Sequence, residues 1–530
     1  MLRNYGQLRD TEKPLVVSAI LLALSEKSFK VSNLEGDLVK TDGEVIFDAL
    51  VSHMLRVKVE PEVKKQQLLN QFIVIKDRTI LNQKDTRLKE EISKDSYLEK
   101  TPLRYFTEYI EKNIVKAIKA NTSEDILGRF YGEFISYGGG DGQTLGVVLT
   151  PKHITELFCD LADLKPSDIV FDPCCGTGGF LISAMHKMLE QAGSDVEKQT
   201  IRKERLHGIE VREDMFAIAS TNMILRGDGK SNLIKDDFLK APIKSLRKKN
   251  YTVGFMNPPY SQAKGKDTAH LSEIIFIEHL LDGLADGGRC VVIVPQSTMV
   301  GKTKEDKQVK KRILEKHTLE GVITLNKETF YGVGTNPCLA IFTAHKPHSD
   351  KKYCKFINYE DDGFAVRKHI GLVETERAKE RKAHLLDVWL QDTPAESKFM
   401  VKTTIEHDDE WLHSFYYFND EIPKSEDFEK TTVDYLTFEL NMVMQGRQYL
   451  FENESNVTFK VNKSMEVNLK NMTWSEFFLK DVFSEIQRGK RLKKVTIKWA
   501  LFLTFLRLLL TMVLMDLLAI RKRLGDSQIV

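Results

Sequence analysis

The chain has 530 residues, of which 42% are apolar and 29% charged, and its formal net charge is +2. This composition is that of a soluble globular protein long enough for two to four domains. The nearly balanced charge excludes a chain that is basic throughout, so any nucleic-acid-binding surface must come from local clusters of lysine and arginine. The six cysteines form no C-x-x-C pair and the N-terminus has no signal-peptide pattern, which predicts a reduced, cytoplasmic location.

Two regions with different patterns come first in chain order. Residues 1–125 show helical apolar spacing and little strand signal, which predicts a helical N-terminal domain. In residues 126–375 short β-rich runs alternate with helical segments, which predicts an α/β, Rossmann-like domain with a mostly parallel seven-stranded sheet. The last two runs are close enough for a hairpin, so one strand is expected to be antiparallel. The candidate strands are Asp168–Asp172, Leu206–Val211, Asn232–Ile234, Val253–Met256, Arg289–Val294, Gly321–Leu325 and Cys338–Phe342.

The first strand of this domain runs into a glycine-rich turn between Asp172 and Phe180. Glycine has no Cβ and tolerates positive φ, so the backbone amides of such a turn can approach a ligand closely. The turn lacks both the Gly-Lys-Ser/Thr of a phosphate loop and the G-x-G-x-x-G of a nicotinamide site. The next strand ends in Glu210, a carboxylate suited to hold ribose hydroxyls. The glycines alone would fit an ordinary turn, but together with the two acids they predict a nucleoside-containing ligand.

A second motif, Asn257-Pro258-Pro259-Tyr260, directly follows an apolar strand. The prolines cannot continue the strand and fix the backbone where it leaves the carboxyl edge of the sheet, where open α/β sheets bind ligands. The Asn257 side-chain oxygen and the Pro258 carbonyl can accept both hydrogens of an exocyclic amino group, which makes its nitrogen more available to an electrophilic methyl. Tyr260 offers a face on which a base can stack. The motif predicts methylation of an amino nitrogen.

The order of these motifs resembles that of the amino DNA methyltransferases, in particular the modification subunits of type I and BcgI-like restriction–modification systems. The resemblance covers residues 126–375 well and extends weakly on both sides. It implies transfer of a methyl group from S-adenosylmethionine to N6 of an adenine flipped out of double-stranded DNA, without a metal. It also implies a specificity subunit and, in some systems, a restriction subunit as partners, and no membrane.

The same resemblance assigns the cofactor-binding residues. An upstream Thr-Pro element that contacts the cofactor corresponds to Thr150-Pro151. The glycine loop corresponds to Asp172, Gly176, Thr177 and Gly178, and the ribose acid to Glu210. The acid that contacts the cofactor's adenine corresponds to Asp237, with Asp236 as the alternative.

Basic residues occur in two groups after the second motif. Lys264 and Lys266 are placed for phosphate contacts. The second group is interspersed with Glu305 and Asp306, which favours a solvated helix face. Its members are Lys302, Lys304, Lys307, Lys310, Lys311 and Arg312.

The C-terminal part is less regular. Residues 376–470 predict a helical or mixed linker region, and 471–494 resemble the opening of a target-recognition domain that then breaks off. A free choice of synonymous codons from about Val495 onward, read two bases later, spells the Pro-Tyr-Val-Ser-Ser segment and Asn-Asn-Gly turn expected next. We therefore expect 495–530 to be a frameshifted tail and the target-recognition domain to be truncated. The alternatives for the apolar run Trp499–Ile520 are a buried helix or a membrane anchor, although Arg507 and Asp516 oppose the latter.

Other functions fit parts of the pattern. The second motif also suits N4 methylation of cytosine, and related loops methylate glutamine amides in protein or amino groups in RNA. A non-enzymatic alternative is a truncated subunit that binds only cofactor or partners. The DNA target sequence, the subunit stoichiometry, an accompanying nuclease and the activity of this chain alone are not encoded in any pattern that the sequence displays.

Overall fold

The computed structural model describes residues 2–446 except 60, 95, 116–148, 228–231, 261, 263–265, 302, 332–333, 368–370 and 420–423. The expectations for 471–494, for the tail 495–530 and for Lys264 and Lys302 therefore lie outside the described residues. The chain divides into two compact units, Met1–Phe418 and Asn419–Val530. The described part of the second unit contains the helix α20 (Ser425–Met444).

The N-terminal region is helical, as its apolar spacing predicts. Helix α2 is buried along nearly its whole length and packs against α3 and against α13 of the following domain, and α3 begins with a capping box between Thr41 and Glu44. Strands β1 (Asp85–Ser93) and β2 (Ser96–Lys100) form an antiparallel hairpin that the sequence did not predict, because its charged residues hide the alternation of a strand. The helices are α1 Leu2–Gly6, α2 Glu12–Leu24, α3 Asp42–Arg56, α4 Glu62–Phe72, α5 Val74–Asp77, α6 Thr79–Asn82 and α7 Pro102–Tyr109, which continues into a π-helical turn, Ile110–Ile114.

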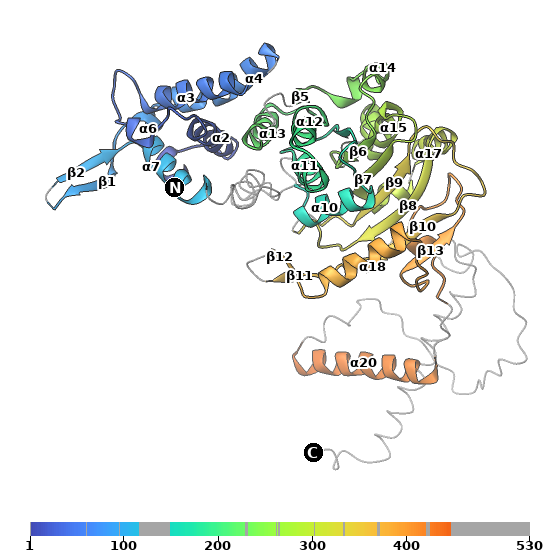
Figure 1. Cartoon of the computed structure of the whole chain (residues 1–530). Helices are drawn as coiled ribbons and strands as arrows, with labels where there is room; N and C mark the ends of the chain where they lie inside the picture. Colours follow the sequence, from blue (N-terminus) through green and yellow to red (C-terminus); the bar gives the residue numbers. More distant parts are fainter. Residues whose placement is uncertain are drawn as a thin grey trace, which may run out of the picture. The chain divides into compact units, whose positions relative to one another are not determined.

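A nine-stranded sheet forms the centre of the first unit, in the order β13-β10-β8-β9-β7-β6-β3-β4-β5 (Figure 1). All neighbours are parallel except β9, which is antiparallel to β7 and β8, and β13, which is antiparallel to β10. The Rossmann-like fold and its hairpin are confirmed, with two strands more than the expected seven. The strands are β3 Val170–Asp172, β4 Leu206–Glu210, β5 Asn232–Lys235, β6 Val253–Met256, β7 Arg289–Pro295, β8 Thr318–Leu325, β9 Pro337–Thr343, β10 Cys354–Tyr359 and β13 Met400–Thr403.

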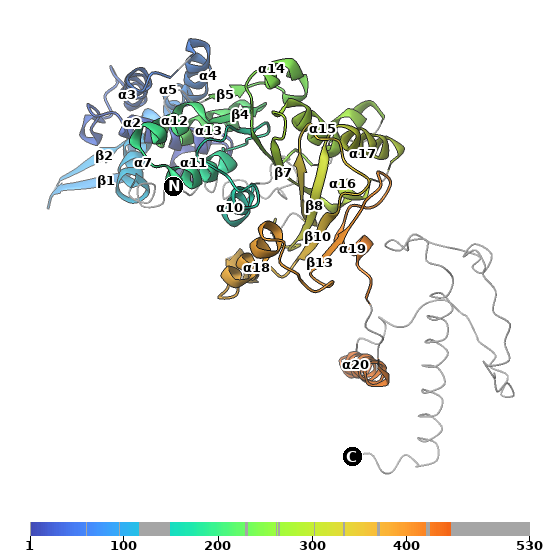
Figure 2. The same cartoon turned by 45° about the vertical axis from the view of Figure 1, so that its right-hand side comes forward.

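Helices cover both faces of this sheet (Figure 2). Strand β7 shows why: Val291 and Ile293 point into one apolar layer, and Val292 and Val294 into the other. The first layer includes α10 (Lys152–Leu161), α11 (Gly179–Gln191), α12 (Asp195–Glu204), α13 (Glu213–Leu225) and α18 (Ala378–Leu390). The second includes α14 (Ile243–Arg247), α15 (Glu273–Gly283), α16 (Gln296–Val300), α17 (Lys304–Lys316) and α19 (His413–Tyr416).

The sheet continues into the segment expected to be a linker region. Strand β13 lies within 376–470, and Trp411, which follows it, is completely buried in the second apolar layer. The domain limits at 125 and 375 remain predictions, but the compact unit itself reaches Phe418. In the part of the chain that the structure describes, no helix is both long and apolar enough to cross a bilayer.

One lysine of the second basic group is not on a solvated face. Lys310 is completely buried, and its Nζ donates hydrogen bonds to the backbone carbonyls of Met299, at 3.0 Å, and Asp409. The ammonium group also lies 4.1 Å from the centre of the Trp411 ring. Its neighbours Arg312 and Lys316 form ion pairs with α15. Lys310 thus holds the segment around Asp409 against α17, a role that the charged sequence of this helix conceals.

The buried lysine predicts a pH-dependent stability. Burial lowers the pKa of Lys310 from 10.5 to about 7, so between these values the unfolded chain binds a proton that the folded chain lacks. The stability of the protein, measured against a Lys310→Met variant, should rise as the pH increases from about 7 to about 10, by up to about 1.4 kcal/mol per pH unit. Thermal unfolding at several pH values measures this. The exposed neighbour serves as control, since Lys311→Met should show no such trend, and a trend absent from both variants would contradict the prediction.

Candidate functional site

The glycine turn joins β3 to α11 and is tied to the neighbouring strand. Gly176 and Gly178 have φ values of +52° and +88°, a region that side-chain-bearing residues rarely adopt. The amide of Cys175 donates to the carbonyl of Ile209, at 3.0 Å, which fixes the turn against β4. The buried Asn222 of α13 donates to the carbonyl of Thr177 at 2.9 Å. The turn is therefore held in one conformation from both sides.

The structure brings Asp172 and Glu210 together with this turn. Glu210, at the end of β4, accepts hydrogen bonds from the amide of Gly176, at 2.9 Å, and of Arg212, at 2.8 Å. Asp172 is completely buried, and its Oδ1 accepts from the amide of Cys174 at 3.2 Å. Its Oδ2 has no hydrogen-bond partner among the described residues. Burial raises the pKa of both carboxyl groups, and the charge of Glu210 adds to the rise at Asp172.

The two candidate acids after β5 have different surroundings. Asp237 caps the short 3-10 helix Phe238–Lys240 by accepting from the amide of Leu239 at 3.2 Å, and it pairs with Lys240. The Asp236 side chain is exposed and accepts only from the amide of the next residue among the described contacts. Asp236 and Asp237 both directly follow β5, where the acid that contacts an adenine ring is expected.

Two apolar residues of this edge were missed by the sequence reasoning. Val211, directly after Glu210, is 60% exposed, and Ile234, on β5, is 50% exposed. Ile234 pairs with Ile209 in the register and Val211 directly follows β4, so both lie at this edge of the sheet. An exposed apolar surface beside a carboxylate suits an aromatic ring such as a purine. The apolar residue that follows the acidic strand end is the signal that could have identified it.

The proline-containing loop follows β6 at the same edge. Asn257 Nδ2 donates a hydrogen bond to Thr150 Oγ1 at 3.0 Å, so the upstream Thr-Pro element lies against this loop. The hydrogen bond between Asn257 and Thr150 joins two motifs that are 107 residues apart in the sequence. Of the prolines in these motifs, Pro151 directly precedes α10 and Pro258 is buried.

Tyr260 is half-buried at the end of the loop. Its hydroxyl donates to the carbonyl of Ile293 at 3.3 Å, and the edge-on ring of Phe330 lies 6.1 Å away between centroids. Burial raises the pKa of the Tyr260 phenol well above its usual value, so the group stays neutral. Phe330 was not predicted, because it lies in an irregular segment after β8.

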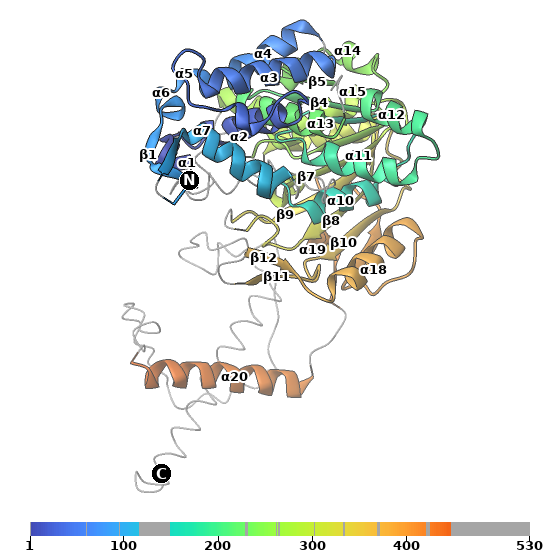
Figure 3. The same cartoon turned by 60° about the vertical axis from the view of Figure 1, so that its left-hand side comes forward.

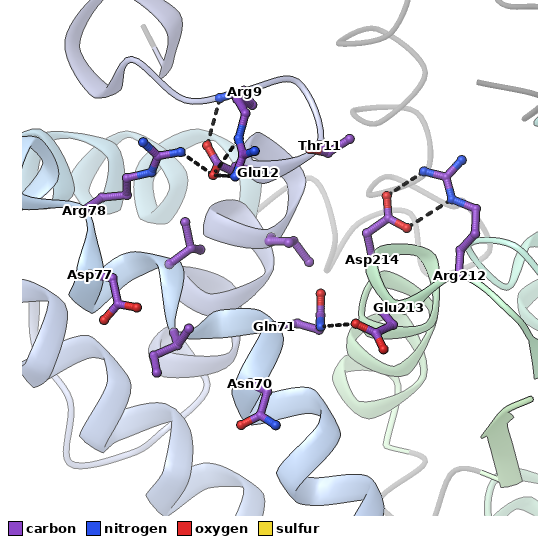
Figure 4. A pocket seen from close by; sticks show the side chains of 13 residues that line it. Arg9, Thr11, Glu12, Asn70, Gln71, Asp77, Arg78, Arg212, Glu213 and Asp214 are labelled. Atoms are coloured by element: carbon purple, nitrogen blue, oxygen red, sulfur yellow. Dashed lines mark hydrogen bonds and ion pairs between the residues drawn. The ribbon is translucent and has the colours of Figure 1, made fainter. Parts of the chain in front are cut away.

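A cleft of about 770 Å³ is lined by residues of the N-terminal helices and by Arg212, Glu213 and Asp214, which follow β4 (Figure 4). Glu12 on its wall is partly desolvated, but hydrogen bonds from Arg9 and Arg78 lower its pKa to about 2. On the opposite wall Arg212 pairs with Asp214 at 2.7 Å, and Gln71 donates to Glu213 at 3.0 Å. Figure 3 shows the N-terminal helices alongside α13. These helices therefore form one wall of this cleft, whose other wall begins at Arg212, two residues after Glu210.

Comparison with known proteins agrees with this geometry. Residues 122–427, more than half of the chain, match the model of the N-6 DNA Methylase family. The chain belongs to this family. This chain is 51% identical over 453 residues to the type II restriction enzyme and methyltransferase RM.BcgI of Heyndrickxia coagulans. The match covers 85% of this chain and 70% of that protein. The chain is 26% identical over 219 residues to the type I restriction enzyme EcoEI methylase subunit of Escherichia coli, and spans less than half of that subunit.

Solved structures show the same fold. A protein from a type I restriction–modification system superposes with a TM-score of 0.53 at 16% identity, covering 84% of this N-6 DNA methylase and 94% of that chain. A modification subunit of a putative type I restriction enzyme from Vibrio vulnificus superposes with a TM-score of 0.51 at 15% identity, covering 76% and 89%. The expected relation to type I and BcgI-like methyltransferases, and S-adenosylmethionine as cofactor, are confirmed. Among the described residues of this methylase, no three His, Cys, Asp or Glu side chains cluster as metal ligands do.

The positive φ of Gly178 predicts that alanine at this position destabilises the protein more than alanine at Gly193 does. At Gly178 a Cβ would meet only ordinary contacts, the nearest at 3.8 Å, so the cost of Gly178→Ala comes from its positive φ. We expect the free energy of unfolding to fall by about 1–2 kcal/mol. Gly193→Ala is the control, since the described backbone there has no positive φ and the nearest atom lies at 3.9 Å. Chemical denaturation measures both, and equal effects would contradict the argument.

Proposed function

We propose that this protein transfers a methyl group from S-adenosylmethionine to N6 of an adenine flipped out of double-stranded DNA, as the modification component of a restriction–modification system. The observation that carries the proposal is the contact between Asn257 and Thr150 at the same sheet edge as Asp172 and Glu210. An amide acceptor and a nucleoside-binding set lie on adjacent strands there. This is the arrangement that direct methyl transfer to an amino group requires.

The cofactor assignment rests on the chemistry of the donor and acceptor groups. S-adenosylmethionine, when bound, supplies an electrophilic methyl group. Glu210 accepts the ribose hydroxyls, the open backbone at Gly176 and Gly178 admits the methionine part, and Asp172 offers the buried acceptor for its ammonium group. Asp237 would accept a hydrogen bond from the amino group of the cofactor's adenine, and the exposed Val211 would offer that ring an apolar contact. Thr177, in the glycine turn, and Pro151, directly before α10, complete the proposed set.

Asn257 is the central residue of the transfer step. Its amide nitrogen donates to Thr150, so its Oδ1 is turned into the acceptor that takes one hydrogen of the adenine amino group. The carbonyl of Pro258 accepts the second hydrogen, and Pro259 keeps the backbone from turning it away. Tyr260 stacks on the flipped base, an interaction worth roughly 1–3 kcal/mol. Tyr260 stays protonated, so it acts as a neutral aromatic surface and not as a base.

The partners follow from the relatives. RM.BcgI is named as both a restriction enzyme and a methyltransferase, and the type I relatives are named as methylase subunits. We propose that this chain binds double-stranded DNA together with a specificity subunit, and in some assemblies a restriction subunit, in the bacterial cytoplasm. All six cysteines are free thiols, which suits that compartment.

Incubation with labelled S-adenosylmethionine and double-stranded DNA, with and without a specificity subunit, tests the proposal. Nucleoside analysis should recover the label as N6-methyladenine. Asn257→Ala should lower transfer by a hundredfold or more, on the order of the loss from removing one essential hydrogen-bonding group, while cofactor binding is retained. Label in N4-methylcytosine, RNA or protein would replace adenine with that substrate, and full activity of Asn257→Ala would refute the mechanism.

The hydroxyl of Thr150 provides a second prediction. Thr150→Val keeps the volume but removes the acceptor for Asn257 Nδ2, so the amide is no longer held in one orientation. We expect kcat to fall roughly ten- to hundredfold while KM for S-adenosylmethionine changes little. Thr150→Ser, which keeps the hydroxyl, should retain most of the activity. A higher KM with an unchanged kcat would instead assign Thr150 to the cofactor, as the family resemblance implies.

A further inference from the structure

A small hairpin, β11 (Phe364–Arg367) with β12 (Gly371–Glu374), forms a two-stranded sheet of its own at the beginning of α18 (Figure 1). The hairpin follows β10, which is parallel to β8. Strand β9 is antiparallel to both β8 and β7, so β8 and β7 run in the same direction. The carboxyl ends of β10, β8, β7 and β6 therefore meet at one edge of the sheet. The hairpin thus begins at the same edge as the loop from Asn257 to Tyr260.

The hairpin lies against segments that border that loop, at its base through Phe364 and next to its turn through Gly371. At the base the ring of Phe364 stacks on His153, three residues after Thr150, with centroids 4.0 Å apart. Asn326, directly after β8, donates to Asp362 at 2.9 Å and to the carbonyl of Phe364 at 3.3 Å. Next to the turn of the hairpin, a Cβ at Gly371 would lie 3.8 Å from Tyr331, the neighbour of the residue that packs on Tyr260.

The two faces of the hairpin differ. Phe364 and Val366 point to the face of the hairpin that contacts His153, whereas Ala365 and Arg367 point to the opposite face. Arg367 pairs with Gly371 in the register, so its side chain projects to the face on which Tyr331 lies. Arg367 is exposed, Tyr331 is 55% exposed, and Val366 is 40% exposed.

The charge of this face is not neutralised by any residue that the structure describes. Among the described residues no carboxylate forms an ion pair with Arg367, whereas Arg377 and Arg381, at the start of α18, both bind Asp361. A two-stranded hairpin with exposed apolar residues is only marginally stable in water by itself. An exposed arginine beside an exposed aromatic ring is the combination that binds a phosphate backbone and an unstacked base.

We propose that this face of the hairpin, made by Arg367 and Tyr331, contacts the DNA beside the flipped base, with Arg367 on a phosphate and Tyr331 against a neighbouring base. The proposal rests on the proposed function, which brings a duplex to this edge. DNA is the occupant that the geometry favours for two reasons. The substrate base must enter the loop from Asn257 to Tyr260, which the hairpin borders, and the exposed charge of the hairpin is positive.

Binding of the full chain to a fluorescent DNA duplex over a series of salt concentrations tests this. Arg367→Gln should weaken binding about three- to tenfold at low salt and reduce the slope of log K against log salt by about 1. Tyr331→Ala should weaken binding about fivefold or more without changing the slope, because it removes stacking and no charge. Cofactor binding and the thermal unfolding midpoint should stay unchanged in both.

Lys203→Gln is the matched control. It removes one exposed positive charge close to the start of β4, at the opposite edge of the sheet, and should leave affinity and slope as in the wild type. An Arg367→Gln variant indistinguishable from this control overturns the proposal. So does a variant that binds DNA normally but no longer assembles with a specificity subunit, because that outcome assigns the hairpin to a protein partner.

The same measurements separate this proposal from the proposed function. A wild-type chain that binds DNA through Arg367 yet transfers no methyl group refutes the function and supports the hairpin. A wild-type chain that methylates DNA while both variants bind like the control refutes only the hairpin. Absence of any DNA binding, by the chain alone and together with a specificity subunit, refutes both.

Discussion

The pairing of β3 with β4 on one side and β6 on the other is the constraint on which the site depends. Val170 aligns with Leu206 and with Val253, and all three strands run in the same direction. Their carboxyl ends must then meet at one edge, which places Asp172, Glu210 and Asn257 on neighbouring strands. A shift in this register by one residue would reverse the faces of every side chain in a strand and separate the acceptor residues from the turn that they hold.

Much of this fold follows from the sequence for a simple reason. The seven predicted strands are short apolar runs, several of which end at proline or acidic residues, and buried parallel strands have this pattern. The candidate site residues could be proposed from the sequence because proline restricts the backbone and glycine adopts conformations that other residues avoid, so both indicate a turn at the end of a strand. The side-chain hydrogen bond between Asn257 and Thr150 was not predicted, because it joins segments that only the packing of α10 brings together.

The elements that were missed depend on tertiary contacts. The β1–β2 hairpin is mostly charged, and β13 has only four residues, so neither has enough apolar alternation to be recognised locally. Lys310 resembles its exposed neighbours in sequence and differs from them only because Asp409 and Trp411 return to cover it. A partner carbonyl supplied from 99 residues away, that of Asp409, leaves no local signal.

The way in which Glu210 is held has a consequence for the affinity of the site. Each of its carboxylate oxygens already accepts one backbone amide, from Gly176 and from Arg212, and each can accept a further hydrogen bond. A ribose can therefore bind without displacing the contacts that order the turn. The conformational entropy of this turn is lost when the protein folds and not when the ligand arrives, so more of the interaction energy is retained as affinity.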